Sequence, residues 1–400
     1  MPTSEREWAA LWPLDPAVTF LNHGSYGACP REVLRHQAAL RAEMEAEPVR
    51  FLGRDLDERL DAARAALAAF VGADADDLAF VANATGGVNA VLRSLRLSPG
   101  DELLTTDHCY QACRNTLDYV AERTGARVVV ATIPFPVVSA QEIVDRVLAK
   151  ATSRTRLALL DHITSPTALV LPIERLIDAL AARGIETLVD GAHAPGMVPL
   201  DLRRLGAAYY SANCHKWLCT PKGSAFLWVR RDRQVDVHPL TISHGARGER
   251  AGRTRFRLEF DWTGTQDPTA WLTVPMAIDY LGGLVPGGWP TLMVRNRALA
   301  LEARRLICAA VGIEPACPDE MIGSIASMIL PDSPATDPTW RARDPIQGRL
   351  FEGWGFEVPI MRWPAPPKRL IRISAQLYND ASQYARLAEA VVKELAAERR

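Results

Sequence analysis

The sequence predicts an α/β fold, with a mainly parallel seven-stranded sheet flanked by helices and a small α+β domain after it. Two observations lead to this prediction. Over the first two thirds of the 400 residues, short apolar runs alternate with helix-length amphipathic segments, and this alternation is typical of a parallel sheet. The last third has a different pattern, in which long helical segments and short strands follow one another without regular alternation.

Seven segments are predicted as the strands of the sheet. They are rich in Val, Leu, Ile, Phe and Tyr and mostly apolar on both faces, as expected for strands that helices cover on both sides. In chain order they are Leu78–Val81, Glu102–Thr105, Arg127–Ile133, Leu157–Leu160, Glu186–Val189, Ala208–Ser211 and Ala225–Val229. Helical patterns lie between the strands, with apolar residues three or four positions apart. One example is formed by Leu56, Leu60, Ala63, Leu67 and Phe70.

The last third of the chain is predicted to form the smaller domain. Its segments are a long helix over Trp289–Val311, then Ile322–Leu330, Asp344–Glu352, Phe356–Ile360, Leu370–Ile373 and a final helix with Tyr384, Leu387, Val391 and Leu395 on one face. Asp380 is placed to cap that helix. The stretch His244–Arg257, with its glycines and arginines, has no periodicity. We expect it to be a mobile loop at the domain boundary, with mainly solvated arginines.

Composition excludes several classes of protein. Lys plus Arg number 46 and Asp plus Glu 47, for a formal charge of −1, whereas a nucleic-acid-binding protein needs a basic excess. No run approaches 18 apolar residues, so no membrane helix is predicted, and the charged N-terminus does not resemble a signal peptide. The seven cysteines form neither a disulfide pattern nor a paired zinc pattern. We therefore expect a cytoplasmic protein with reduced thiols and no metal site.

A lysine and an aspartate at the ends of two predicted strands give the first chemical signal. Lys216 lies in Ser211-Ala-Asn-Cys-His-Lys216-Trp, and Asp190 in Leu188-Val-Asp190-Gly-Ala-His193. A lysine that forms an imine needs burial or cationic neighbours to lose its proton. A pyridine cofactor needs a carboxylate against its ring nitrogen. Both groups follow strands of one α/β sheet, and ligands bind at that edge of such sheets.

A third motif suits a phosphate group. In Phe80-Val-Ala-Asn83-Ala-Thr85-Gly86-Gly87 a predicted strand runs into a helix through a turn of small residues. Free backbone N–H groups, the helix dipole and the Thr85 hydroxyl would together bind an anion. A phosphate site, an imine-forming lysine and a ring-nitrogen acid in one sheet are more specific together than any of them alone.

These motifs resemble those of pyridoxal-phosphate enzymes of fold type I in the class V aminotransferase group, and in particular the isopenicillin N epimerase-like family. The resemblance covers nearly the whole chain. It is carried by Leu21-Asn-His-Gly-Ser-Tyr-Gly, Asp190-Gly-Ala-His-Ala-Pro-Gly, His215-Lys216-Trp-Leu, Gly264-Thr265-Gln-Asp and Leu370-Ile-Arg372-Ile-Ser. It implies pyridoxal 5′-phosphate as the cofactor, an N-terminal segment 1–30 that packs on the active site, a large cofactor-binding domain 31–281 and a small C-terminal domain 282–400.

The resemblance implies a role for each matching residue of the cofactor site. Lys216 would form the imine and exchange the proton at the substrate Cα, and Asp190 would bind the pyridine nitrogen. The other cofactor contacts would be His193 and Ser165 near the phenolic oxygen O3′, and Ala84, Thr85, Ser211 and His215 at the phosphate. Thr265 would reach the phosphate across the interface of a homodimer with shared active sites.

Ring stacking and substrate binding are also implied by the resemblance. Desulfurases of the group have a histidine where His108 stands, whereas the epimerase keeps a tyrosine that matches Tyr110. Both are candidates for the residue that stacks on the cofactor, and His108 is the one we favour. Arg372 matches the arginine that binds the substrate carboxylate, for which a guanidinium group is well suited. Asn22, His23 and Tyr26 belong to a segment that folds over the active site in relatives, and they are expected to contact the substrate.

The last cysteine of the chain, Cys317, lies well before Arg372, so the nucleophilic loop cysteine of the desulfurases is missing. We therefore expect chemistry at the Cα of an amino-acid group, through an external aldimine and a quinonoid. The leading hypothesis is β-elimination by a carbon–sulfur lyase on a cysteine conjugate in secondary metabolism, such as lincosamide antibiotic biosynthesis. Epimerisation, decarboxylation and aminotransfer are alternatives. A non-catalytic binding protein with the same fold is the alternative of another class.

Overall fold

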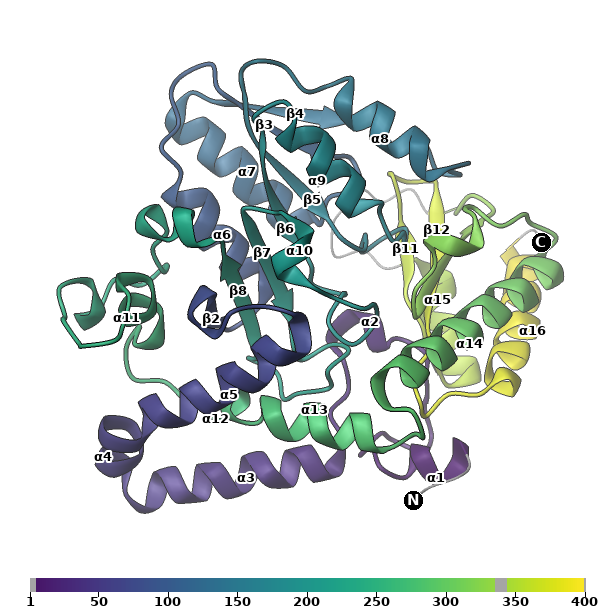
Figure 1. Cartoon of the computed structure of the whole chain (residues 1–400). Helices are drawn as coiled ribbons and strands as arrows, with labels where there is room; N and C mark the ends of the chain where they lie inside the picture. The colour runs from purple at the N-terminus through teal and green to yellow at the C-terminus, as the bar shows by residue number, and fades with distance from the viewer. Residues whose placement is uncertain (1–4, 335–343, 399–400) are drawn as a thin grey trace.

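The computed structural model describes residues 5–334 and 344–398. At its centre lies a seven-stranded sheet, with the strand order β2-β8-β7-β6-β5-β3-β4 (Figure 1). The strands are β2 (Leu78–Val81), β3 (Glu102–Thr106), β4 (Arg127–Ala131), β5 (Thr155–Asp161), β6 (Glu186–Asp190), β7 (Tyr209–Asn213) and β8 (Ala225–Val229). Every predicted strand is present, and the mainly parallel seven-stranded sheet is confirmed.

Strand β8 alone interrupts the parallel arrangement of this sheet. It runs antiparallel to both of its neighbours, β7 and β2, whereas β7, β6, β5, β3 and β4 are mutually parallel. The predicted strand 127–133 ends two residues early, at Ala131. The predicted strand 157–160 extends to Thr155 and Asp161. The extension matters for the site, because it brings Asp161 into register with Asp190 of β6.

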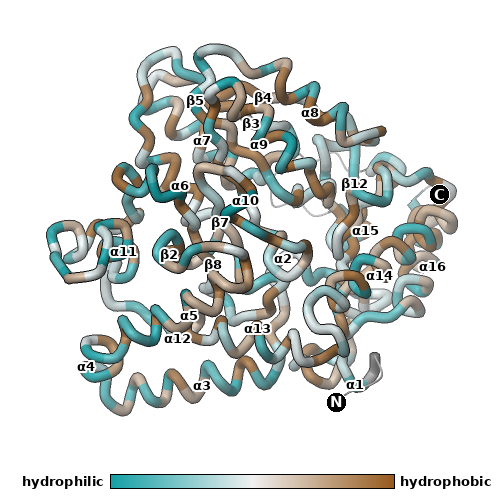
Figure 2. Tube along the Cα trace, in the orientation of Figure 1, coloured by the Kyte–Doolittle hydropathy of each residue, from teal (hydrophilic) through white to brown (hydrophobic). Residues whose placement is uncertain are grey.

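Helices cover both faces of the sheet, and they account for the apolar strands. One face packs against α6 (Ala84–Ser94), α7 (Gln111–Thr124) and α11 (Arg255–Asp261), and the other against α5 (Leu56–Val71), α8 (Ala140–Leu148) and α9 (Ile173–Ala181). Successive residues of β5 alternate between these two cores, with Leu157 and Leu159 on one side and Ala158 and Leu160 on the other. A strand buried on both faces has no polar face. In Figure 2 the hydrophobic colours accordingly follow the central strands, whereas α3 (Arg31–Ala46) alternates along its length.

Local signals set several helix ends. The side chains of Asn83, Ser139 and Thr254 each accept a hydrogen bond from a backbone N–H in the first turn of α6, α8 and α11, as N-cap residues do. The remaining helices of this part are α1 (Glu5–Ala9), α2 (His23–Tyr26), α4 (Pro48–Arg50), α10 (Leu202–Leu205), α12 (Thr269–Leu272) and α13 (Val274–Gly283), and a π-helical turn over Phe51–Asp55 joins α4 to α5.

The C-terminal third forms a separate α+β layer. It contains α14 (Gly288–Val311), β9 (Ile325–Leu330), α15 (Pro345–Trp354), β10 (Phe356–Glu357), β11 (Ile360–Arg362), β12 (Arg369–Ser374) and α16 (Ala381–Glu398). Strands β11, β12 and β9 make an antiparallel sheet, and β10 pairs with β1 (Thr19–Phe20) of the N-terminal segment. The predicted cap of α16 is present, because the Asp380 carboxylate accepts a hydrogen bond from the Gln383 N–H. The expected domain boundary at residue 282 falls next to the end of α13 at Gly283, and the division into domains stays a prediction.

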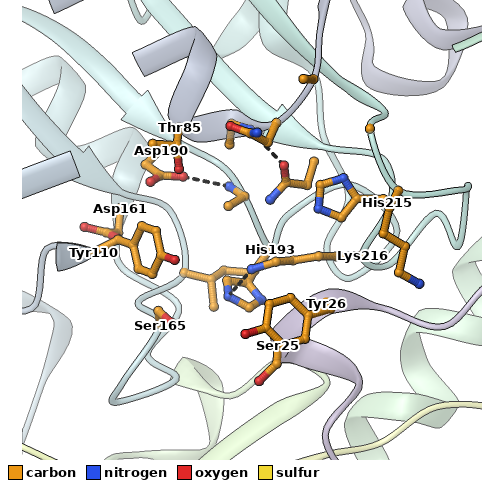
Figure 3. Close-up of a pocket in the computed structure, with 18 residues that line it drawn as sticks. Ser25, Tyr26, Thr85, Tyr110, Asp161, Ser165, Asp190, His193, His215 and Lys216 are labelled. Atoms are coloured by element: carbon orange, nitrogen blue, oxygen red, sulfur yellow. Dashed lines mark hydrogen bonds between the residues drawn. The ribbon is translucent and has the colours of Figure 1, made fainter. Parts of the chain in front are cut away.

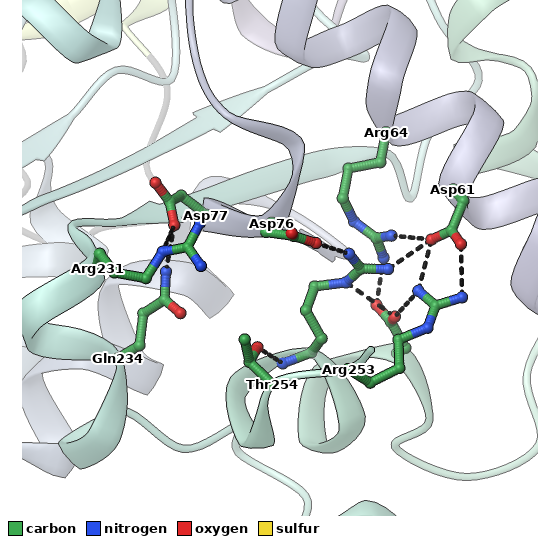
Figure 4. A network of polar contacts seen from close by, with 10 residues as sticks. Asp61, Arg64, Asp76, Asp77, Arg231, Gln234, Arg253 and Thr254 are labelled. Carbon is green, nitrogen blue, oxygen red and sulfur yellow. Dashed lines mark hydrogen bonds and ion pairs between the residues drawn. The ribbon is translucent and has the colours of Figure 1, made fainter. Parts of the chain in front are cut away.

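The arginine-rich stretch His244–Arg257 agrees with its prediction only in part, because Arg247, Arg250 and Arg255 are exposed whereas Arg253 and Arg257 are not, and its mobility stays a prediction. It leads directly into α11 and lies on the large sheet layer, where Arg253 and Arg257 enter a network of ion pairs with α5 (Figure 4). Arg257 is buried and pairs with Asp61 at 2.5 Å and with Asp261 at 3.1 Å. The buried Arg64 of α5 also pairs with Asp261. Periodicity could not reveal this, because Asp61 of α5 lies far from Arg257 in the sequence.

No helix in the described ranges, 5–334 and 344–398, has the length and apolar composition that crossing a membrane requires.

Candidate active site

A cavity of about 530 Å³ opens where the strands β5, β6 and β7 end and α6 begins (Figure 3). Ligands of open α/β sheets bind at this edge. The cavity is lined by Ser25, Tyr26, Ala82, Asn83, Ala84, Thr85, Tyr110, Asp161, Ile163, Ser165, Asp190, Ala192, His193, Asn213, His215, Lys216, Lys222 and Gly223. Most of the residues predicted for the cofactor are therefore brought together here.

The Lys216 side chain reaches into the cavity from the turn after β7. Its Nζ lies 3.1 Å from His193 Nε2. Burial, assisted by the positive charge of Arg372, lowers the pKa of Lys216 to about 7. Burial likewise holds the pKa of His193 well below its usual range. A lysine with a pKa near neutrality has a large fraction of free amine, as imine formation requires.

Asp190 ends β6 and is buried at the bottom of the cavity. One carboxylate oxygen accepts the Ala192 N–H at 3.0 Å, and the other accepts the Cys113 thiol at 3.1 Å. Burial raises the pKa of Asp190, while these two hydrogen bonds and the charge of Lys216 oppose that rise. The sequence did not point to Cys113, because a lone cysteine near the start of a helix is not a motif.

A second carboxyl group, Asp161, lies beside Asp190 and was also missed. The two residues are register partners on neighbouring strands. The side chain is almost fully buried, at 2% exposure, and its Oδ2 has no hydrogen-bond partner among the described residues. Burial, and the charge of Asp190 next, hold the pKa of Asp161 well above its usual range. A pattern in the sequence could have predicted this residue. Leu159-Leu160-Asp161 ends an apolar run with an aspartate, as Leu188-Val189-Asp190 does.

The phosphate end of the predicted site is the N-terminus of α6. Asn83 and Ala84 line the cavity there together with Thr85 and His215. The sequence predicted free backbone N–H groups, but two of them have side-chain partners. The Ala84 N–H donates to the Asn213 amide oxygen, and the N–H two residues later donates to Asn83, both at 2.8 Å. Thr85 and the start of α6 still border the cavity.

Ser211 supports this turn from below and does not line the cavity. Its hydroxyl is fully buried and donates to the Ala84 carbonyl at 2.9 Å. Gly87 packs directly on it, since a Cβ at position 87 would lie 2.1 Å from the Ser211 hydroxyl oxygen. A glycine is therefore required for the close approach of α6 to β7.

Ser165 lines the cavity next to the C-terminal α+β layer, and Arg372 contacts Ser165 from behind. Arg372, in β12, is 1% exposed and lies behind the lining residues. Its guanidinium donates to the Ser165 carbonyl at 2.7 Å and to the Ser25 hydroxyl at 3.0 Å, and its Nε is buried without a partner in the described part of the chain. Burial lowers the pKa of Arg372 to about 10, so the group stays charged at neutral pH.

The three N-terminal candidates occupy different places. Tyr26 lines the mouth of the cavity and is 75% exposed. Asn22 lies outside the lining and donates to a Glu357 carboxylate oxygen at 3.1 Å. His23 is buried behind Lys216, where Nδ1 contacts the Tyr378 hydroxyl at 2.7 Å and Nε2 contacts the Lys216 carbonyl at 2.9 Å. Asn22 and His23 thus fix the segment, while Tyr26 can reach a ligand.

The two stacking candidates are separated by the structure. Tyr110 lines the cavity and is 43% exposed, and Figure 3 shows its ring and Lys216 entering from opposite sides. His108 is buried outside the lining, with Nδ1 at 2.7 Å from the Thr167 hydroxyl and its ring at 4.6 Å from the ring of Trp363. By this geometry Tyr110, and not His108, faces a ligand.

Thr265 lies away from this cavity. It is exposed in the connection between α11 and α12, next to Gly264 with its positive φ of 120°. Within one chain it contributes nothing to the site.

The residues present fit pyridoxal 5′-phosphate. A half-buried amine lies across the cavity from a buried carboxylate, and a helix start with a hydroxyl borders the space between them. Asp161 Oδ2, which has no hydrogen-bond partner among the described residues, lies beside Asp190 as a further polar group. This arrangement suits a ligand with an aldehyde, a protonated ring nitrogen and a phosphate.

Comparisons with known proteins agree with this geometry. Residues 27–284 match the model of the family described as Aminotransferase class-V. The chain is 38% identical over 396 residues to isopenicillin N epimerase of Amycolatopsis lactamdurans, with 96% of each chain covered. It is 30% identical over 404 residues to a protein of Arabidopsis thaliana named "Probable L-cysteine desulfhydrase, chloroplastic", covering 94% of this chain and 83% of that one. A solved structure of C-DES with glycine linked to its PLP cofactor has a TM-score of 0.78 at 20% identity, covering 98% and 99% of the two chains.

Proposed function

The chain belongs to the aminotransferase class-V family, with pyridoxal 5′-phosphate as its cofactor, and on that premise we propose that it is a carbon–sulfur lyase acting on a cysteine conjugate. The cofactor supplies an aldehyde for imine formation and a protonated ring that accepts electrons from the substrate Cα. Overall, the conjugate and one water yield a thiol, pyruvate and ammonia. A biosynthetic role in secondary metabolism remains part of this proposal.

The observation that carries the proposal is the Lys216 amine inside the cavity, with its lowered pKa. β-Elimination needs one group that takes the Cα proton, together with a thiolate that can leave. Lys216 supplies that group, because its pKa of about 7 makes it an efficient proton acceptor near neutral pH. Asp190, hydrogen-bonded on both oxygens, is held in place to pair with the ring nitrogen. The relative named as an L-cysteine desulfhydrase fits a sulfur-containing amino acid.

Recognition of the substrate carboxylate is assigned to Arg372 in this proposal. Its guanidinium is charged and buried, and a carboxylate bound there gains charge-assisted hydrogen bonds that water does not weaken. The Ser165 and Ser25 hydroxyls now contact two of its nitrogens. A bound carboxylate would take over the contact with Ser25, which lies on the cavity side.

The residues that line the cavity do not include a cysteine. Cys317, the last cysteine of the sequence, is buried and contacts Arg304. A reaction that passes sulfur to a protein thiol in this cavity is therefore not favoured.

Epimerisation is the second candidate, and a specific observation favours it. The relative with 38% identity is named for that reaction, and inversion at Cα needs a proton donor on the face opposite Lys216. Tyr110 enters the cavity opposite that lysine. Aminotransfer and decarboxylation have no such support.

The functional unit is proposed to be a homodimer with shared active sites. Thr265 is exposed and far from the cavity of its own chain, although the family resemblance implies that it contacts a cofactor phosphate. A two-fold axis would place each Thr265 beside the site of the partner, because such interfaces are self-complementary.

Incubation in deuterated water separates the two reactions. An S-alkyl cysteine and an amino acid without a leaving group are supplied in parallel, and the products are analysed by mass spectrometry. Release of thiol and pyruvate supports the lyase. Deuterium at Cα of an otherwise intact, stereochemically inverted amino acid supports the epimerase and contradicts the lyase. No turnover of either compound together with no visible absorbance band would contradict both.

A further inference from the structure

Trp217, the residue after the reactive lysine, contacts the histidine that faces this lysine. Its indole Nε1 donates a hydrogen bond to His193 Nδ1 at 3.4 Å. On the other side of the imidazole, Nε2 lies 3.1 Å from Lys216 Nζ, a contact that Figure 3 shows as a dashed line. Trp217 and His193 are both buried, so water does not compete for these atoms.

The chemistry of the three groups determines where the imidazole proton lies. An indole N–H can only donate, so His193 Nδ1 must present its lone pair to Trp217. A neutral imidazole carries one proton, which is then on Nε2. The charged imidazolium would place a second N–H against the indole donor. The imidazole is therefore neutral, and its only N–H is directed at Lys216.

The indole is held so that it cannot turn away. The ring of His23 lies 4.8 Å from the ring of Trp217. His23 itself is fixed by the Tyr378 hydroxyl and by the Lys216 carbonyl. The cost of turning the indole would include breaking this buried packing, since protein interiors are close-packed.

We propose that Trp217 is a positioning residue for Lys216: its indole N–H fixes His193 as the tautomer with the proton on Nε2, and His193 then presents that N–H to the lysine amine. The inference rests on the proposed role of Lys216 as the cofactor-binding lysine. It does not depend on which reaction follows.

This tautomer selects the uncharged form of the lysine. A neutral amine has a lone pair that can accept the Nε2 proton, whereas an ammonium group would face it as a second donor. The same preference appears in the lowered pKa of Lys216, for which burial and Arg372 are the main causes. The geometry thus keeps the amine ready to react.

The wild-type protein tests the proposal directly. We suggest labelling the eight histidines with ¹⁵N and recording ring ¹H–¹⁵N correlation spectra of the holoenzyme and of the cofactor-free protein at neutral pH. The His193 signals are assigned by their loss in His193→Gln. We expect one neutral tautomer with the proton on Nε2. A proton on Nδ1, or an equal mixture of tautomers, overturns the proposal without any variant of Trp217.

Trp217→Phe removes the donor and keeps an aromatic ring. Because one hydrogen bond of ordinary net strength changes a two-state ratio by about 2- to 10-fold, the tautomer ratio of His193 should fall by that factor. Nε2 would then partly become an acceptor and favour the ammonium form of Lys216. The pH midpoint for the reaction of the cofactor-free protein with added pyridoxal 5′-phosphate, followed by absorbance, should rise by about 0.3–1 pH unit.

Trp228→Phe is the matched control. Trp228 is a buried tryptophan of β8, and its indole N–H has no partner among the described residues. This variant also removes one indole N–H but should leave both the tautomer and the pH midpoint unchanged. Equal spectra and midpoints in Trp217→Phe and the wild type would overturn the proposal. Failure of the wild type to bind the cofactor would instead contradict the proposed function.

Discussion

Replacing Lys216 by Met should stabilise the cofactor-free protein at neutral pH. The amine lies in a mostly buried environment, which opposes its protonation and lowers its pKa from 10.5 to about 7. The unfolded chain keeps the usual pKa, so between these pH values it binds more protons than the folded chain. Stability therefore rises with pH through this window. Met has a similar length, carries no charge and removes the effect.

The magnitude follows from the difference between the two pKa values. At about 1.36 kcal/mol per pH unit, lowering the pKa from 10.5 to about 7 costs the folded state about 4.4 kcal/mol at pH 7 and about 0.8 kcal/mol at pH 10. These are upper values, because relaxation and water entry reduce the cost of a buried charge. The gain from Lys216→Met should accordingly shrink by up to about 3.6 kcal/mol between pH 7 and pH 10.

The assay is urea unfolding of the cofactor-free proteins at both pH values, followed by tryptophan fluorescence. The comparison across pH removes any contribution of the Met side chain that does not depend on pH. Lys222→Met is the control, since that lysine is exposed at the mouth of the same cavity. If the effect of Lys216→Met depends on pH no more than the effect of this control, the burial argument for Lys216 is refuted.

Three further predictions concern the ring nitrogen, the dimer and the ion-pair network. Asp190→Asn should lower turnover by at least about 10²–10⁴-fold, comparable to the loss of a proton-transfer group, and a loss below tenfold in a steady-state assay would mean that the carboxylate does not serve the cofactor. Thr265→Ala should weaken cofactor retention. Mixing this variant with inactive Lys216→Ala should restore partial activity, because each hybrid dimer has one site with both substitutions and one with neither. A fully active monomer in gel filtration would contradict shared sites. Arg257→Met should lower the free energy of unfolding by about 1–3 kcal/mol, because it removes a buried guanidinium that donates to Asp61, Asp76 and Asp261, while Arg253 and Arg64 still pair with Asp61 and Asp261. The exposed Arg247→Met should change it by less than about 0.5 kcal/mol; equal denaturation midpoints for the two would argue that the network is not stabilising.

The order of strands and helices along the chain could be predicted from local sequence patterns. Each strand of the sheet is a short apolar run between helical periodicities, and these patterns depend only on neighbouring residues. The burial of Arg257 in the segment His244–Arg257 was not predicted, for the same reason. Its arginines look solvated in sequence, yet Arg257 is buried because carboxylates of α5 and α11 lie within reach of it. No residue near Arg257 in the sequence indicates that an aspartate of α5 will lie beside it.

The sequence by itself determined the family and the cofactor, and it predicted that Lys216 and Asp190 lie in one cavity, because the chemistry requires those residue types after strands of one sheet. Only the tertiary structure decided what surrounds them. Asp161 joins Asp190 through the register of two parallel strands, and Cys113 reaches the same carboxylate from a helix that packs on another strand. It also decided that Tyr110 faces the cavity while His108 is buried. The physical reason is that local sequence determines where a strand ends, whereas the direction and contacts of a side chain beyond that end depend on packing between segments distant in the chain.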